Sequence, residues 1–249
     1  MSQNSEENTR RGGLSVAVQH LAQNRTEAAL LLTRLTTIAL TALYLVPLSP
    51  LPLSSVYQKA LLASAATSAL RLHQRLPPFR LSREFLALLI AEDSAHYLLF
   101  AVIFAANNVL SLALLPVALF AFLHFSSQTL ALIDRSGPRG VVGNALSTVV
   151  ESYQRSILQT VSLAEIALMP TLVFALLSGM TSLIAPFIYY RFLALRYSSR
   201  RNPYSRQMFR ELKVSLQTMV LRAFCPQLVR NAVNAAIGLV ERLAPPILT

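Results

Sequence analysis

The stretch that decides the fold runs from Asp93 to Asp134 and reads DSAHYLLFAVIFAANNVLSLALLPVALFAFLHFSSQTLALID. Its 40 interior residues contain no Asp, Glu, Lys or Arg. A helix that crosses the hydrocarbon core needs about 20 residues, so this stretch is too long for one span. The Asn107-Asn108 pair near its middle favours a turn. We therefore predict two spans, at 84–106 and 109–133, joined as a tight hairpin; a single crossing with an interfacial remainder is the alternative.

Further apolar runs lie on both sides of this stretch. Residues 28–48 predict one span that ends at the prolines between 47 and 52, because proline cannot continue a helix. Residues 161–195 predict either one long kinked span or two short helices that meet near Gly179. Residues 54–76 are only moderately apolar and predict an interfacial helix or a weak span.

The composition supports the same class of protein. Of the 249 residues, 54% are hydrophobic and 13% charged, and the mean hydropathy is +0.50. Soluble domains carry about 25% charged residues, so an ordinary soluble enzyme is excluded. We predict an all-α polytopic membrane protein with membrane-embedded helical hairpins and C-terminal amphipathic helices. A polar segment at 1–27 precedes a multi-pass region at 28–196, and a basic tail follows at 197–249.

The distribution of basic residues predicts the orientation in the membrane. The 54–83 segment holds five basic residues and no acid before Glu84, and the C-terminal part from Arg191 onward has ten basic residues against two acids. Short cytosolic loops are enriched in Lys and Arg, so both segments are expected in the cytosol. This places the N-terminus in the lumen unless 54–76 itself crosses. Asn24 begins a glycosylation sequon that is usable only on the luminal side.

Glu92, Asp93 and His96 form a candidate intramembrane polar cluster. Glu92 and His96 are spaced to share a helix face, and ionisable groups in a span are functional candidates. They could relay protons or, with His124 as a third ligand, hold a metal. The sequence favours a structural role in which they pair with a basic residue such as Arg34. We predict no catalytic residue, metal site, cofactor or small-molecule substrate.

A dense basic segment follows the last apolar run. Four tyrosines are interleaved with it, which could suit nucleic acid. Its position beside an apolar run favours contacts with anionic lipid headgroups or a partner, and no nucleic acid. The candidate contact residues are Arg196, Arg200, Arg201, Arg206 and Arg210.

Two amphipathic helices are expected in the tail, at 205–223 and 227–244. At 100° per residue, the apolar side chains of the second helix fill one half of its circumference. Such a helix suits a membrane interface, while packing on a partner or on the transmembrane bundle is the alternative. The candidate membrane-interface residues are Leu228, Val229, Val233, Ile237, Val240 and Leu243.

Three long stretches resemble the transmembrane protein 33 family, also called Krüppel homologue 2, which has pore-membrane relatives in fungi. They are PFIYYRFLALRYSSRRNPYSRQMFRELKV from Pro186, YQKALLASAATSALRLHQRLPPFRLSREFL from Tyr57, and EDSAHYLL from Glu92. VERLAP, from Val240, also resembles the end of the family sequences.

The resemblance implies a multi-pass protein of the endoplasmic reticulum and nuclear envelope. It implies roles in tubular reticulum structure with reticulon-like proteins, in nuclear pore distribution and in the unfolded-protein response. It also implies that the C-terminal helices engage the lipid bilayer and a nuclear transport receptor. Our first hypothesis is therefore a non-enzymatic scaffold. The alternatives are a transporter or channel subunit, or an intramembrane enzyme, that uses Glu92, Asp93 and His96.

Overall fold

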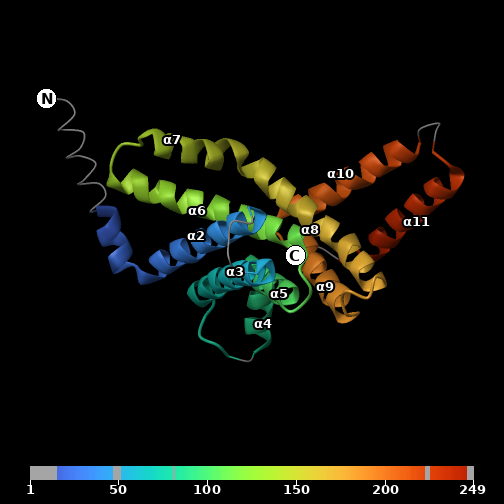
Figure 1. Cartoon of the computed structure of the whole chain (residues 1–249), viewed down its shortest axis with the longest axis horizontal. Helices are drawn as coiled ribbons and strands as arrows, with labels where there is room; N and C mark the ends of the chain where they lie inside the picture. The colour runs from blue at the N-terminus through green and yellow to red at the C-terminus, as the bar shows by residue number, and fades with distance from the viewer. Residues whose placement is uncertain (1–15, 47–51, 81, 222–224, 246–249) are drawn as a thin grey trace.

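The computed structural model describes residues 16–46, 52–80, 82–221 and 225–245, and within these ranges it is helical with no strand (Figure 1). This confirms the predicted all-α class. The helices are α2 (Arg25–Leu45), α3 (Leu53–Arg75), α4 (Arg83–Ala91), α5 (Asp93–Ala105), α6 (Leu114–Ser136), α7 (Val141–Thr148), α8 (Gln154–Leu177), α9 (Ile184–Ser198), α10 (Pro203–Val220) and α11 (Gln227–Leu243). A helical segment at 16–23 precedes α2, and the predicted proline end of the first helix lies partly outside the described residues.

Local sequence explains several of the helix boundaries. The Ser82 hydroxyl accepts a hydrogen bond from the Phe85 backbone N–H at 3.1 Å and caps the start of α4. Pro203 occupies the first turn of α10, where a missing N–H costs nothing. Gly179 follows α8 with φ of 69°, a conformation that glycine adopts without strain. The break near Gly179 separates α8 from α9. This agrees with the predicted alternative of two helices that meet near Gly179.

Among the residues that the structure describes, length and hydropathy single out three candidate membrane spans: α2, 111–136 and 141–177. The α4–α5 pair is a fourth candidate, but its two helices are bent by 78°. The predicted span over 84–106 is therefore not one straight helix but is broken near Glu92. The predicted tight hairpin is wrong, because α5 packs mainly against α3 and α9 rather than against α6.

The close packing of α3 against its neighbours follows from small side chains. Ala60, Ser64 and Ser68 recur every four residues along α3 and are all buried. Small residues at this spacing let helix backbones approach closely in a membrane protein. α3 runs antiparallel to α2, with the hydroxyl groups of Thr67 and Thr33 hydrogen-bonded at 2.8 Å. This hairpin explains why a segment of only moderate hydropathy lies inside the bundle.

An aromatic cluster forms the centre of the core. Phe100 and Phe104 of α5 pack against Tyr189 and Phe192 of α9, with ring centroids 5.2 to 6.1 Å apart. All four side chains are fully buried, and Tyr57 of α3 joins the same cluster. Aromatic pairs at these separations contribute beyond their buried area. The cluster holds α5 and α9 side by side, next to the charged side chains at the start of α5.

The helices run between two ends of the bundle that differ in charge. At one end, Tyr44 is hydrogen-bonded to Ser111, and the Asn108 side chain donates to the Met180 carbonyl oxygen. The described parts of the connections at this end, 52–58, 105–113 and 177–184, contain no charged residue. At the other end lie the start of α2, the ends of α3, α6 and α9, and the start of α5, as shown by contacts such as Gln128 to the Glu27 carbonyl. We call these the uncharged end and the basic end.

Candidate functional site

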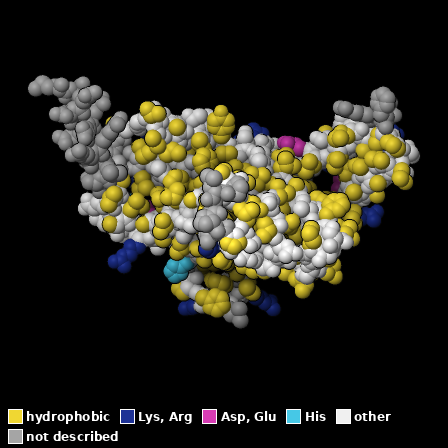
Figure 2. Space-filling model, in the orientation of Figure 1, with side chains coloured by type: hydrophobic (Ala, Val, Ile, Leu, Met, Phe, Trp, Pro, Cys, Tyr) yellow, Lys and Arg dark blue, Asp and Glu magenta, His cyan; other side chains and the backbone are white. Residues whose placement is uncertain are grey.

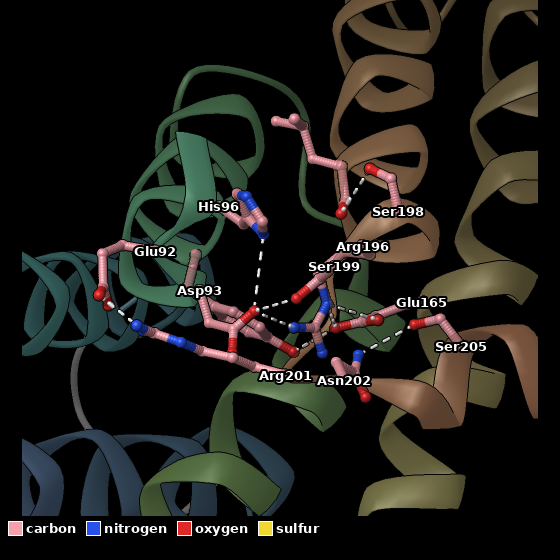
Figure 3. Close-up of polar contacts among 12 residues, drawn as sticks. Glu92, Asp93, His96, Glu165, Arg196, Ser198, Ser199, Arg201, Asn202 and Ser205 are labelled. Atoms are coloured by element: carbon pink, nitrogen blue, oxygen red, sulfur yellow. Dashed lines mark hydrogen bonds and ion pairs between the residues drawn. The ribbon is translucent and has the colours of Figure 1, made fainter. Parts of the chain in front are cut away.

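Glu92 lies at the break between α4 and α5, at the basic end (Figure 3). Its backbone is extended there, and its carboxylate accepts from Arg75 Nη1 at 3.1 Å and from Arg201 Nη1 at 2.6 Å. The predicted pairing with Arg34 is wrong. The Glu92 carboxylate thus links the end of α3 and the segment after α9 to the bend between α4 and α5.

Asp93 begins α5, where a negative charge suits the helix dipole. Its Oδ1 accepts from Arg196 Nη1 at 3.3 Å and from the Ser199 hydroxyl at 3.2 Å. Arg196 in turn donates from Nε to both carboxylate oxygens of Glu165 at 3.1 Å. This ion-pair chain joins α5, α9 and α8 through three side chains (Figure 3).

Arg196 and Glu165 are sealed inside the bundle, with exposed fractions of 1% and 0%. The Tyr97 hydroxyl donates to Glu165 Oε1 at 2.5 Å, and the Arg196 guanidinium lies 5.3 Å from the centre of the Tyr97 ring. With its oxygen toward Arg196, the Asn202 amide accepts from Nη2 at 2.7 Å. The prediction that Arg196 contacts lipid headgroups or a partner protein is therefore wrong, because side chains of this chain surround it completely.

The other predicted basic contacts are divided between internal and surface positions. Arg201 is half-exposed but binds Glu92, and Arg206 donates to the carbonyl oxygens of Tyr197 and Ser199 at 3.1 and 3.0 Å. These carbonyls belong to the last turn of α9 and the residue after it, so Arg206 closes that helix end. Arg200 and Arg210 are exposed. A role in headgroup or partner contact remains a prediction for these two.

His96 is almost fully buried and does not share a helix face with Glu92, because Glu92 lies at the break before α5. Its Nε2 lies 2.7 Å from the Ile90 carbonyl oxygen and its Nδ1 lies 3.8 Å from Asp93. His124, the suggested third ligand, lies on α6 near Arg71 instead. Within the described ranges, no group of three or more His, Cys, Asp or Glu side chains could hold a metal ion.

Glu165 is the member of the site that the sequence analysis missed. Its signal was present, because it is an isolated carboxylate at the edge of a long apolar run. An ionisable residue in such a run marks a functional or paired position. With Glu165 included, three carboxylates meet the three guanidiniums of Arg75, Arg196 and Arg201. The three negative and three positive charges balance. This arrangement favours a structural ion-pair network over a proton relay.

The two C-terminal helices form a hairpin at the right of Figure 1. Arg230 Nε donates to the Val220 carbonyl oxygen at 3.1 Å, Lys213 pairs with Glu241, and Tyr190 donates to the Leu243 carbonyl at 3.0 Å. The helix α10 ends at Val220, and the predicted extension to 223 lies outside the described residues.

The candidate interface residues of α11 fall into two sets. Val233 and Ile237 are half-buried at one edge of the apolar half, next to the half-buried Arg230. The rest of that half is exposed and adds to the hydrophobic side chains visible over α10 and α11 in Figure 2. The exposed members are Leu228, Val229, Leu239, Val240 and Leu243. The packing of α11 on α10 thus covers only one edge of the stripe.

Comparison with known proteins gives a consistent family. The sequence matches the family described as Transmembrane protein 33/Nucleoporin POM33 over residues 9–246. It is 45% identical to human Transmembrane protein 33 over 93% of this chain and 94% of that protein. It is 41% identical to Krueppel homolog 2 of Drosophila melanogaster, over 92% and 83% of the two chains. No solved structure matches.

Proposed function

This chain belongs to the Transmembrane protein 33/Nucleoporin POM33 family, and we propose that it is a non-enzymatic scaffold that organises curved membrane of the endoplasmic reticulum and nuclear envelope. The observation that carries the proposal is the exposed apolar half of α11, a helix that packs on α10 and is hydrogen-bonded to α9 of a helical membrane bundle. The family name, which includes a nucleoporin, supports the nuclear envelope as one location.

The charge difference between the two ends supports a cytosolic basic end. The connections at the basic end and the tail carry most of the arginines, whereas the nearest charge to the uncharged end is Lys59. Lys and Arg accumulate in short cytosolic loops. Since α3 runs from one end to the other beside α2, the start of α2 lies at the same end as the tail. We infer a cytosolic N-terminal segment, which is the alternative given above for the case that 54–76 itself crosses, and which leaves Asn24 unmodified.

Glycosylation scanning tests this orientation. A sequon introduced near Arg80 is expected to stay unmodified in microsomes, because this loop lies at the basic end. A sequon in a short spacer inserted at Gly179 is expected to be modified, because that loop lies at the uncharged end. Modification near Arg80 without modification at Gly179 would invert the orientation.

The position of α11 supports insertion into one leaflet. The Tyr190 hydroxyl donates to the Leu243 carbonyl oxygen and holds the end of α11 beside α9, six residues from the start of α9 at Ile184 and eight from its end at Ser198. Amphipathic helices rest about 5–10 Å into the boundary between headgroups and acyl chains. A helix inserted into the cytosolic leaflet from its own side expands that leaflet more than the luminal leaflet and favours positive curvature.

The partners that we propose follow from the same surfaces. Anionic headgroups of the lipid bilayer suit the exposed Arg210 and Arg242 beside the apolar half of α11. The protein partners implied by the resemblance are reticulon-like membrane proteins and a nuclear transport receptor. The resemblance also implies a role in modulating the unfolded-protein response. The balanced ion pairs around Arg196 hold the bundle that carries these surfaces.

Rescue of reticulum shape in depleted cells tests the proposal. The wild-type chain should restore tubules, whereas Val229→Asp, Val240→Asp and Leu243→Asp together should fail, because each puts a carboxylate on the exposed apolar half. The matched control adds three carboxylates to the polar half as Asn231→Asp, Asn234→Asp and Ala235→Asp, and should rescue. Equal rescue by both variants would contradict the proposed role of the apolar half of α11 in shaping the membrane.

A further inference from the structure

A cavity of about 330 Å³ opens between α2, α3, α5, α6 and α8 at the basic end. Its volume lies in the range of small-ligand sites. Side chains of Arg34, Arg71, Arg75, Arg196 and Arg201 reach its wall, and Asp93 is the acid that lines it. The wall also carries the hydroxyl groups of several buried residues: Thr37, Ser64, Ser68 and Ser94.

Two of these guanidiniums form no ion pair with a carboxylate among the described residues, at a distance of 4 Å or less. Arg75, Arg196 and Arg201 are balanced by Glu92, Asp93 and Glu165, as described above. Arg71 instead lies 3.5 Å from His124 Nε2. Arg34 donates to the Gln128 side chain at 2.6 Å and to the His124 carbonyl oxygen at 3.3 Å. The cavity therefore has a formal excess of two positive charges.

Arg34 gives the strongest indication that the cavity accepts an anion. It is 4% exposed, and its Nε lies buried without a hydrogen-bond partner in the described part of the chain. The nearby Arg71 is a like charge that repels it. Uncompensated buried charge is costly, and an unused N–H on a buried guanidinium adds a desolvation penalty. Both costs fall when an anion enters the cavity.

We propose that this cavity binds a phosphate group, held between Arg34 and Arg71, from an anionic phospholipid headgroup or from a free phosphate compound. A phosphate monoester carries a charge of about −1.5 to −2 at neutral pH, which matches the excess of two. The planar fork of arginine donates two parallel hydrogen bonds to phosphate oxygens. Hydroxyl donors on the wall complete a polar shell suited to such a group. The membrane-shaping proposal does not depend on this site.

Thermal unfolding of the full-length protein in neutral detergent tests the proposal. Inorganic phosphate and dioctanoyl phosphatidic acid serve as probes, with chloride at equal ionic strength and dioctanoyl phosphatidylcholine as controls. A rise of the unfolding midpoint with both probes identifies a free phosphate as sufficient. A rise with the phosphatidic acid alone identifies a lipid headgroup. Either result supports the site.

Three variants locate the effect. Arg71→Gln and Arg34→Gln should each raise the half-saturating probe concentration about tenfold, since a hydrogen bond to a charged group is lost. Arg71→Gln should leave the midpoint without probe unchanged or higher, because it relieves repulsion. Arg83→Gln, an exposed arginine at the same end, should behave as the wild type. The proposal is overturned if neither probe raises the wild-type midpoint above its control. It is also overturned if Arg83→Gln weakens the response as much as Arg71→Gln does.

Discussion

Arg196→Met is expected to destabilise the protein by about 3–5 kcal/mol, because it leaves the buried Glu165 carboxylate without its charge partner. For a chain of this size, such a loss lowers the thermal unfolding midpoint by on the order of 10 °C. The midpoint of the full-length protein in detergent is the measurement. Arg210→Met, which removes an exposed arginine, should change it little.

A second variant separates charge pairing from lost packing. Adding Glu165→Gln to Arg196→Met removes the orphaned charge but keeps an oxygen that accepts from Tyr97. The double variant should therefore recover at least half of the lost stability. An unchanged midpoint in Arg196→Met would contradict the structural role of the ion pair. A proton relay predicts a different outcome, in which Glu165→Gln alone abolishes ion flux while stability is retained.

Binding of α11 to anionic liposomes is expected to disappear when its exposed apolar half is charged. A peptide covering 227–244 should gain helicity on such liposomes, and more on small ones, because lipid packing is looser there. Val229, Val240 and Leu243 are all exposed in the structure, and burying each would contribute up to about 1.5–3 kcal/mol. Their replacement by Asp should therefore weaken binding by far more than tenfold.

The matched control decides whether the apolar half or the net charge is responsible. The peptide with Asn231→Asp, Asn234→Asp and Ala235→Asp carries the same three added charges on the opposite side of the helix. It should keep most of its liposome binding, measured by circular dichroism and flotation. If the unmodified peptide ignores liposomes, the exposed stripe is a protein contact and the interfacial interpretation is wrong.

Several elements could be predicted because they depend on local composition. The uncharged runs located α2 and α6, and turn-forming residues at Asn107 and Gly179 located the gaps between helices. The spacing of apolar residues also predicted α11. The break at Glu92 was missed because no proline or glycine lies there. It is stabilised by Arg75 and Arg201, which come from distant parts of the chain.

The site was harder to predict than the helices, because burial depends on which helices become neighbours. Arg196 and Arg200 look alike in a basic segment, but only the face of α9 that meets α5 and α8 buries Arg196. The partner of Glu92 could not be chosen among many arginines from spacing alone. Glu165, by contrast, was recoverable, since an isolated acid in an apolar run calls for a buried cation.

The most direct test of the central claim is the shape of vesicles that contain the purified full-length protein. At increasing protein-to-lipid ratios, electron microscopy of reconstituted liposomes should show narrower vesicles and tubules. The variant with Val229→Asp, Val240→Asp and Leu243→Asp should leave the vesicles at their starting diameter while still inserting. If the wild-type protein inserts and the vesicle diameter stays unchanged at every ratio, the chain does not shape membranes.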